Sequence, residues 1–178
     1  GGAEGYDMGI IRFTPDGSNR MYATYIGGSK NEIPMSLVSD KAGNLIVLAR
    51  TNSENFPTTL STFGMGGGYD IAVTKLNAMG TGLICSRTIG GNFADGVNIK
   101  LSSADPAGIE GVRRAWGDDC RSMIILDTAE NIIIVSQTKS TIFPTTAGAF
   151  QNYLAGSMAG GQDGVIFKSS PDLTTILF

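Results

Sequence analysis

Histidine is absent from this chain of 178 residues, and only 16% of the residues are charged. Without histidine, the chain can hold neither a Ser-His-Asp nor a Cys-His catalytic arrangement, nor any histidine-ligated metal site. The two cysteines, Cys85 and Cys120, lie far apart in the sequence and fit no metal or redox motif. They are either joined in a disulfide or buried as free thiols, which behave as small hydrophobic side chains.

Clustered basic residues and long apolar runs are also missing. The net charge of −3 provides no electrostatic attraction for nucleic acid, so we expect no nucleic-acid partner. The longest apolar runs, such as 132–135, are far shorter than the roughly 18 residues that suggest a membrane-spanning helix. No signal-peptide pattern opens the chain, so we expect any export signal to lie outside this sequence.

The composition instead favours many short strands joined by tight turns. The chain has 25 glycines and 6 prolines, and 42% of its residues are hydrophobic. Short apolar stretches bounded by Gly, Asn, Asp and Pro predict strands at 7–13, 20–26, 34–39, 44–50, 70–76, 82–89, 122–127, 131–137, 163–168 and 173–178. The sequence therefore predicts an all-β fold.

These strands belong to an internal repeat. Residues 6–13 (YDMGIIRF) recur 63 residues later as YDIAVTKL, and residues 40–47 (DKAGNLIV) recur 87 residues later as DTAENIII. The difference between the two offsets places an insertion of 24 residues between Gly91 and Asp118. In this alignment Asp119 takes the position of Glu32.

Four short antiparallel strands per repeat, at this spacing, are typical of the blades of a β-propeller. We predict a β-propeller of four-stranded antiparallel blades, with about two and a half blades in this chain, as a fragment of a larger propeller. A lone blade gains its core only by packing against its neighbours. The predicted division is the last two strands of a blade at 1–28, a full blade at 29–91, an insertion loop at 92–117 and a second, nearly complete blade at 118–178.

Several pieces of the repeat resemble the SBBP repeat, a family named for seven-bladed propellers and found mainly in exported bacterial proteins. The matching pieces are Asp70–Leu76, Tyr22–Gly28, Leu37–Asn44, Asn55–Thr59 and Ala147–Gln151. The resemblance implies a propeller in an extracellular protein or on the bacterial outer cell surface. It brings no catalytic residue set, because these motifs form blades and a fold does not imply a function.

Three aspartates, Asp7, Asp70 and Asp163, occupy one equivalent position before a strand in successive repeats. Asp oxygens in Gly-rich loops suit calcium, which is the one cofactor worth considering here. The alternative is structural: each carboxylate accepts backbone N–H groups and fixes the turn that leads into its strand. Because the residue recurs in every repeat, we predict the structural role and expect no cofactor and no metal.

Two aromatic-proline pairs also recur at equivalent positions. They are Phe56 with Pro57 and Phe143 with Pro144. Such a pair could face a ligand, but an aromatic residue before a rigid proline at a repeated position is more simply a packing anchor between blades. We therefore predict structural roles for all four residues.

The insertion is the segment that the repeat does not explain. It contains Arg113, Arg114 and Trp116, the only tryptophan. Trp and Arg are enriched at binding hot spots, and insertions in repeat proteins form loops on one face. The three residues either form a binding surface or belong to a surface loop whose tryptophan packs against a blade edge.

The sequence thus favours a non-catalytic structural or interaction module of an exported bacterial cell-surface protein. In this interpretation the propeller is a rigid platform for adhesion-like contacts with proteins or surface glycans, and it also contacts the rest of its own propeller. One alternative is a component of a secretion or gliding apparatus, whose partners would be outer-membrane proteins. Another is a polysaccharide-active enzyme with its site at the propeller channel.

Overall fold

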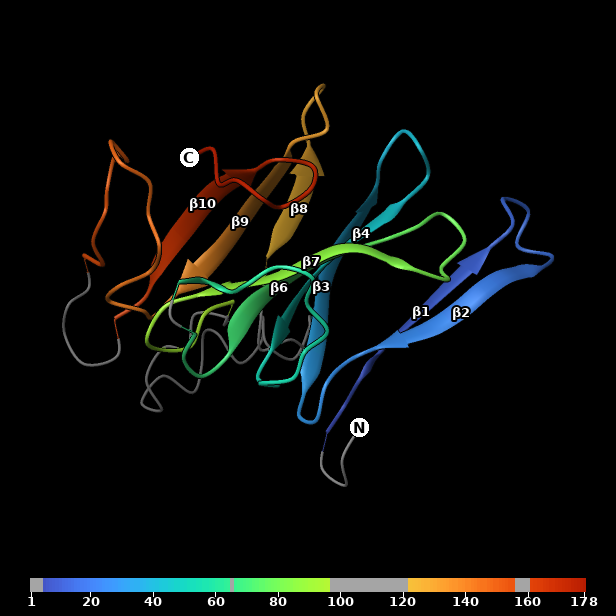
Figure 1. The fold of residues 1–178 in the computed structure, drawn as a ribbon, viewed down its shortest axis with the longest axis horizontal. Helices are drawn as coiled ribbons and strands as arrows, with labels where there is room; N and C mark the ends of the chain where they lie inside the picture. The colour runs from blue at the N-terminus through green and yellow to red at the C-terminus, as the bar shows by residue number, and fades with distance from the viewer. Residues whose placement is uncertain (1–4, 65, 97–121, 156–160) are drawn as a thin grey trace, which may run out of the picture.

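Three sheets make up the fold in the computed structural model, which describes residues 5–64, 66–96, 122–155 and 161–178 (Figure 1). The strands are β1 (Met8–Phe13), β2 (Arg20–Ile26), β3 (Glu32–Ser39), β4 (Leu45–Thr51), β5 (Phe63–Gly64), β6 (Asp70–Leu76), β7 (Leu83–Gly90), β8 (Met123–Leu126), β9 (Ile132–Thr138) and β10 (Asp163–Ser169). No helix that could cross a membrane occurs among the described residues. The all-β prediction is confirmed.

The first sheet contains β1 and β2, the second has the order β3-β4-β6-β7-β5, and the third has the order β10-β9-β8. Within the second sheet, β3, β4, β6 and β7 form an antiparallel meander, and the short β5 joins β7 in parallel. This meander falls within residues 29–91, where the sequence predicts a full blade. None of the three described sheets closes on itself.

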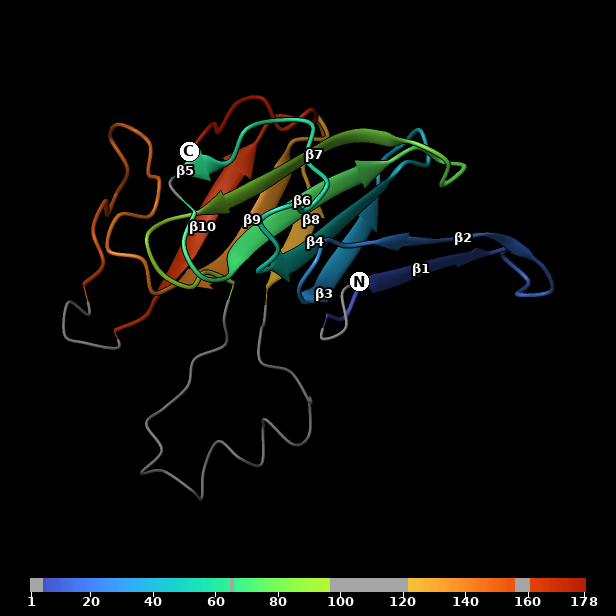
Figure 2. The same ribbon diagram turned by 60° about the horizontal axis from the view of Figure 1, so that its bottom comes forward.

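The second sheet is buried on both faces because it lies between the other two (Figure 2). Neighbouring residues of β4 point to opposite sides: Leu48 joins the core shared with the third sheet, whereas Val47 joins the core shared with the first. In β6, Val73 and Ala72 divide in the same way. Two buried faces explain why these strands have continuous apolar runs rather than an alternating pattern.

The predicted strand at 173–178 is not formed, which corrects the sequence analysis. Residues 170–175 form a turn, closed by a 2.9 Å hydrogen bond from the Ser170 N–H to the Thr175 carbonyl. Only the last three residues remain to pair with β10. They do so through an isolated bridge between Ser169 and Ile176 and a 2.8 Å hydrogen bond from the Lys168 N–H to the Phe178 carbonyl.

In two tight turns, one residue has a left-handed backbone conformation in both copies of the repeat, but the type of that residue differs between the copies. Gly43 and Gly80 have φ values of 79° and 68°, and the equivalent positions hold Glu130 at 64° and Leu173 at 61°. A left-handed conformation costs a residue with a side chain about 1 kcal/mol or more. Compensation comes from contacts: the Glu130 carboxylate accepts the backbone N–H of Lys41 at 2.6 Å, and Leu173 is buried in the core.

At the position of Gly80 and Leu173, a small residue in one sheet packs against a large residue of its neighbour, and a large residue shares a core cluster with a small one. A Cβ on Gly80 would lie 2.4 Å from the ring of Tyr22, so the tyrosine of the first sheet fills the space above the glycine turn. Cys85 is the residue equivalent to Tyr22, and it shares a core cluster with Leu173. Cys85 is a free, buried thiol whose pKa is raised by burial, whereas Cys120 lies outside the described residues.

Candidate functional site

Asp7 and Asp70 lie where adjacent sheets meet, each against a glycine of the neighbouring strand. A Cβ on Gly27 would lie 2.2 Å from the Asp7 Oδ1, and one on Gly90 would lie 2.0 Å from the Asp70 Oδ1. The carboxylates therefore occupy the space of a missing side chain. Asp70 also accepts a hydrogen bond from the backbone of Gly67, in the loop that precedes β6.

A second acidic residue accompanies each of these aspartates. The buried Glu32 accepts hydrogen bonds from the Gly28 N–H at 2.9 Å and the Thr51 hydroxyl at 2.6 Å. We call Asp7, Glu32 and Thr51 the first carboxylate cluster. Its counterpart, the second carboxylate cluster, comprises Asp70, Asp95, Thr138 and Ser140.

The buried Asp95 repeats the contacts of Glu32. It accepts hydrogen bonds from the Gly91 N–H at 2.8 Å, the Ser140 hydroxyl at 2.9 Å and the Thr138 hydroxyl. These hydroxyls come from the segment around the end of β9, and Gly91 follows β7, so the carboxylate joins the second sheet to the third. A repeated network of this kind is a structural link between sheets.

Asp95 also corrects the expected boundary of the insertion. The Asp95 N–H donates to the Tyr69 carbonyl at 2.6 Å, as the Glu32 N–H donates to the Tyr6 carbonyl at 2.7 Å. Asp95, rather than Asp119, is therefore the equivalent of Glu32, and the extra residues follow Gly96 instead of starting at 92. The unbroken offset of 63 residues from Glu32 to Asp95 was a signal available in the sequence.

The predicted binding residues Arg113, Arg114 and Trp116 lie outside the described residues, within 97–121. Their proposed role in binding stays a prediction.

Electrostatics distinguish the second carboxylate cluster. Burial, and then the negative charge of Asp95, raise the pKa of Asp70 to about 6, against the hydrogen bond from Gly67. Burial also raises the pKa of Asp95, although hydrogen bonds from Thr138, Gly91 and Ser140 oppose this. Two such carboxyls in one buried space retain a proton to higher pH than exposed carboxyls do.

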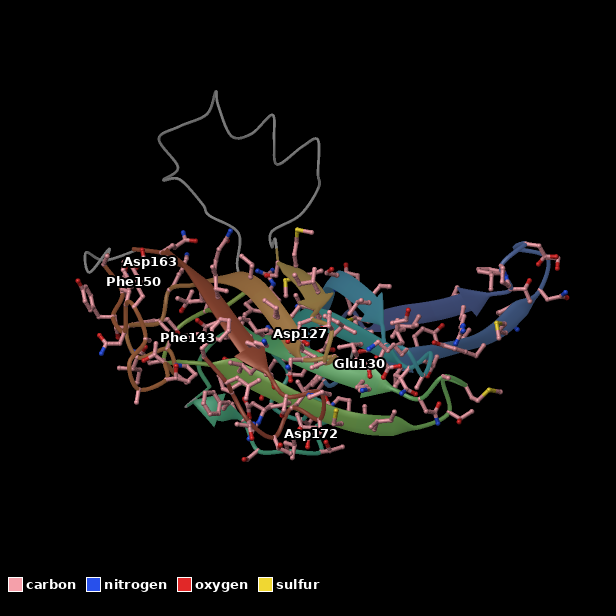
Figure 3. The ribbon with its side chains drawn as sticks, turned by 90° about the horizontal axis from the view of Figure 1, so that it is seen from above. Asp127, Glu130, Phe143, Phe150, Asp163 and Asp172 are labelled. Atoms are coloured by element: carbon pink, nitrogen blue, oxygen red, sulfur yellow. The ribbon has the colours of Figure 1, made fainter. Side chains whose placement is uncertain are left out.

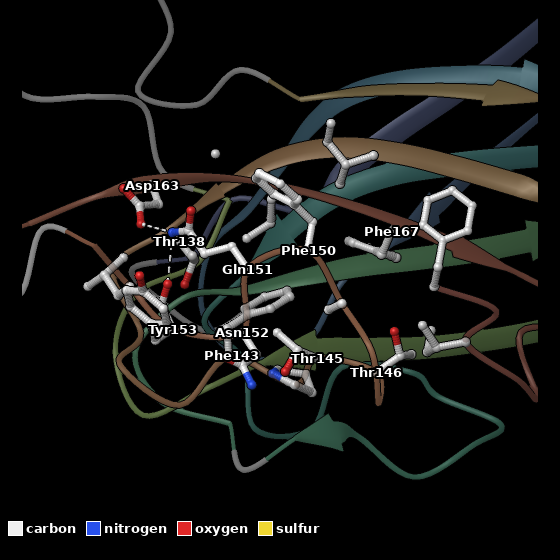
Figure 4. Close-up of a pocket in the computed structure, with 18 of the residues that line it drawn as sticks. Thr138, Phe143, Thr145, Thr146, Phe150, Gln151, Asn152, Tyr153, Asp163 and Phe167 are labelled. Carbon is white, nitrogen blue, oxygen red and sulfur yellow. Dashed lines mark hydrogen bonds between the residues drawn. The ribbon is translucent and has the colours of Figure 1, made fainter.

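Asp163 has different surroundings from Asp7 and Asp70. Its carboxylate accepts the Ala155 N–H at 2.6 Å and the Gln151 side-chain amide at 3.2 Å (Figure 4). It fixes the loop before β10, at the same end of the third sheet as Phe150 (Figure 3). Among the described residues, no group of three or more His, Cys, Asp or Glu side chains could hold a metal ion.

The aromatic-proline pairs contact the two cores between sheets. Phe56 is buried in the core between the first and second sheets. Phe143 packs against the core between the second and third sheets, with its ring centroid 6.3 Å from that of Phe167. Pro144 approaches Gly64 of the second sheet, 3.1 Å from where a Cβ would stand, and Pro57 is half-buried beside Phe56.

Repeated ion pairs, which sequence reasoning missed, tie turns to strands. Lys75 pairs with Asp40 at 2.9 Å, and both side chains are buried; Lys168 pairs with Asp127 at 2.6 Å and is more exposed. Burial disfavours the charged form of Asp40, but the hydrogen bonds from Lys75 and Asn44 outweigh it and lower the pKa of that carboxyl. The Lys168 hydrogen bond holds the pKa of Asp127 well below its usual range.

An open cavity of about 720 Å³ lies between the loop at 141–155 and β10 (Figure 4). Its lining combines apolar side chains, among them Phe143, Phe150 and Phe167, with the hydroxyls of Thr145 and Thr146 and the carboxylate of Asp163. It holds no acid pair or nucleophile with an activating base among these residues. Its combination of apolar side chains with a few polar groups is typical of a ligand-binding pocket.

No family model matches the chain, and no curated protein matches it either.

Proposed function

We propose that this chain is a non-catalytic structural and interaction module, part of a propeller-like stack of blades in an exported bacterial cell-surface protein. The stack is a rigid platform for contacts with proteins or surface glycans. The resemblance to the SBBP repeat supports the propeller and the location. The repeated links between sheets support the rigid stack.

The observation that carries the proposal is the exposed face of the third sheet. Val135 and Ile166 are 48% and 64% exposed, whereas the equivalent residues of the second sheet, Leu48 and Val73, are fully buried against a neighbouring sheet. The third sheet thus presents apolar side chains at the positions where the second sheet contacts its neighbour. A face of this kind is a surface for a further blade.

The stacking part of the proposal is tested with paired charge substitutions. Val135→Lys with Ile166→Lys introduces two charges at positions whose equivalents are buried, so contacts made by this face should be lost. The control is Ser18→Lys with Asn19→Lys, on exposed positions of the turn between β1 and β2. Hydroxyl-radical footprinting of the protein as cells produce it should show this face protected. Full reactivity of Val135 and Ile166 there would contradict the stack.

The location and the activity need a separate experiment. Protease treatment of intact producing cells should remove the protein, and the purified chain should bind glycans or outer-membrane fractions without altering them. Protection inside the cell would contradict export. Turnover of a glycan, with loss of activity on substitution of an acidic residue, would support the alternative of a polysaccharide-active enzyme.

A further inference from the structure

The third sheet differs from the second along one edge of β10. In the second sheet, β6 pairs with β7 from Ile71 to Leu76. On the same side of β10, Lys168 and Ser169 are the only residues with strand partners among the described residues, and these partners are Phe178 and Ile176. These pairs repeat, 93 residues later, the pairs at the equivalent end of β6 and β7. The rest of this β10 edge, residues 163–167, has no strand beside it among the described residues.

In the second sheet, the loop at residues 59–61 is bonded to β7. The equivalent loop beside the third sheet has no strand to which it can bond in the same way among the described residues. The Thr59 N–H donates to the Ser86 carbonyl at 3.0 Å, and the Ser86 N–H donates to the Thr59 hydroxyl oxygen at 2.9 Å. The Arg87 side chain donates to the Ser61 carbonyl at 2.8 Å. Thr146 takes the position of Thr59 in the third sheet, and neither its N–H nor its hydroxyl bonds to another described residue.

An aromatic side chain shows the same difference. Phe63 packs against the core and lies under the guanidinium of Arg87, 5.5 Å from the ring centroid. Its equivalent, Phe150, has a relative exposure of 105%. The open cavity at 141–155 and β10 contains both Phe150 and Thr146 in its lining (Figure 4). The cavity therefore lies where the equivalent part of β7 lies in the second sheet.

We propose that this cavity binds an extended β-strand with the chemistry of Ser86–Gly91, the sequence Ser-Arg-Thr-Ile-Gly-Gly. The Lys168 N–H faces the open edge, and N–H groups two residues apart along a strand face the same side. The N–H groups of Ile166 and Gly164 are thus directed toward the incoming strand. Its serine bonds to Thr146, its arginine lies over Phe150, and its glycines pass Asp163. The inference rests on the internal repeat and does not require the proposed function.

A titration of the unmodified chain with the capped peptide Ser-Arg-Thr-Ile-Gly-Gly tests the interaction in trans. Saturable NMR shift changes are expected at residues 163–167 and at Thr146 and Phe150, with a dissociation constant in roughly the millimolar range for a single short strand. A scrambled peptide of the same composition is the control. Equal shifts with both peptides would overturn the proposal.

A tethered version removes the dependence on weak affinity. Phe178 is equivalent to Cys85, so the six residues can be appended directly after Phe178 in the required register. Compared with a scrambled tail, the matched tail should raise the Tm by roughly 5 °C and slow amide exchange of Gly164 and Ile166 by about tenfold. Equal Tm and exchange for the two tails would overturn the proposal and leave the stacking proposal untouched.

A pair of substitutions then separates backbone pairing from contact with the exposed side chain. Ile166→Pro removes the outward N–H, which is not part of the ladder with β9, and should cancel the gain from the matched tail. Ile166→Thr keeps that N–H and should preserve the gain. Loss of the gain in both variants, or in neither, would contradict strand pairing at this edge.

Discussion

Removing the charge of Asp70 should stabilise the protein, and the gain should appear only above acidic pH. The pKa of Asp70 in the folded state is about 6, raised from 3.8 by burial and by Asp95. The folded state therefore holds the proton more tightly than the unfolded state. The contribution of Asp70 to stability is therefore full below about pH 4, falls as the pH rises through 4 to 6, and stays reduced above that window.

The size of the effect follows from the same values. A rise of about two pKa units corresponds to about 3 kcal/mol at roughly 1.4 kcal/mol per unit. Partial solvation of Asp70 lowers this to about 2 kcal/mol. Asp70→Asn should therefore match the wild type near pH 4 and be about 2 kcal/mol more stable at pH 8, a Tm difference of roughly 4–8 °C.

Urea unfolding of the wild type and Asp70→Asn, measured from pH 4 to pH 8, gives the required curves. Asp163→Asn is the matched control, because Asp163 has the same repeat position but accepts hydrogen bonds from Ala155 and Gln151 instead of lying beside Asp95. A stability difference independent of pH, or the same pH-dependent gain in Asp163→Asn, would refute the reasoning.

Three further substitutions test individual contacts by urea unfolding at pH 7. Lys75→Met leaves the buried Asp40 carboxylate without its ion pair and should cost about 3 kcal/mol. Lys168→Met, at the more exposed pair with Asp127, should cost clearly less, and equal costs would contradict the role of burial. Glu130→Gly should be about 1 kcal/mol more stable than Glu130→Ala. Both variants lose the carboxylate, but only the alanine variant has a Cβ that is strained in the left-handed conformation of residue 130. Leu173→Ala should cost about 2–4 kcal/mol, and a cost below 1 kcal/mol would show that Leu173 is not part of the core.

Much of the fold could be predicted from the sequence, because strand length, apolar runs and turn residues are local signals. The repeat of 6–13 at 69–76 placed β1 and β6 correctly. The prediction of a strand at 173–178 was wrong because the preceding turn extends to Thr175, so that residues 173–175 do not pair with β10. A residue pattern alone does not show whether a partner strand is present beside it.

The carboxylate clusters were only partly accessible to sequence reasoning. Asp7 and Asp70 were found because they recur, but their partners Glu32 and Asp95 differ in residue type. The insertion also separates Asp95 from Thr138, to which it bonds across 43 positions. The raised pKa of Asp70 depends on burial and on the distance to a second carboxylate, and neither is a property of sequence spacing.

The two interfaces between sheets place residues of different size at equivalent positions. At the first interface a large residue, Tyr22, lies over the glycine turn of the following sheet, and at the second a small residue, Cys85, belongs to the same core cluster as Leu173. A leucine at Gly80 would collide with Tyr22, and a glycine at position 173 would leave a void near Cys85. Sheets that share one repeat pattern are thus not interchangeable, because the residue sizes at the two interfaces differ.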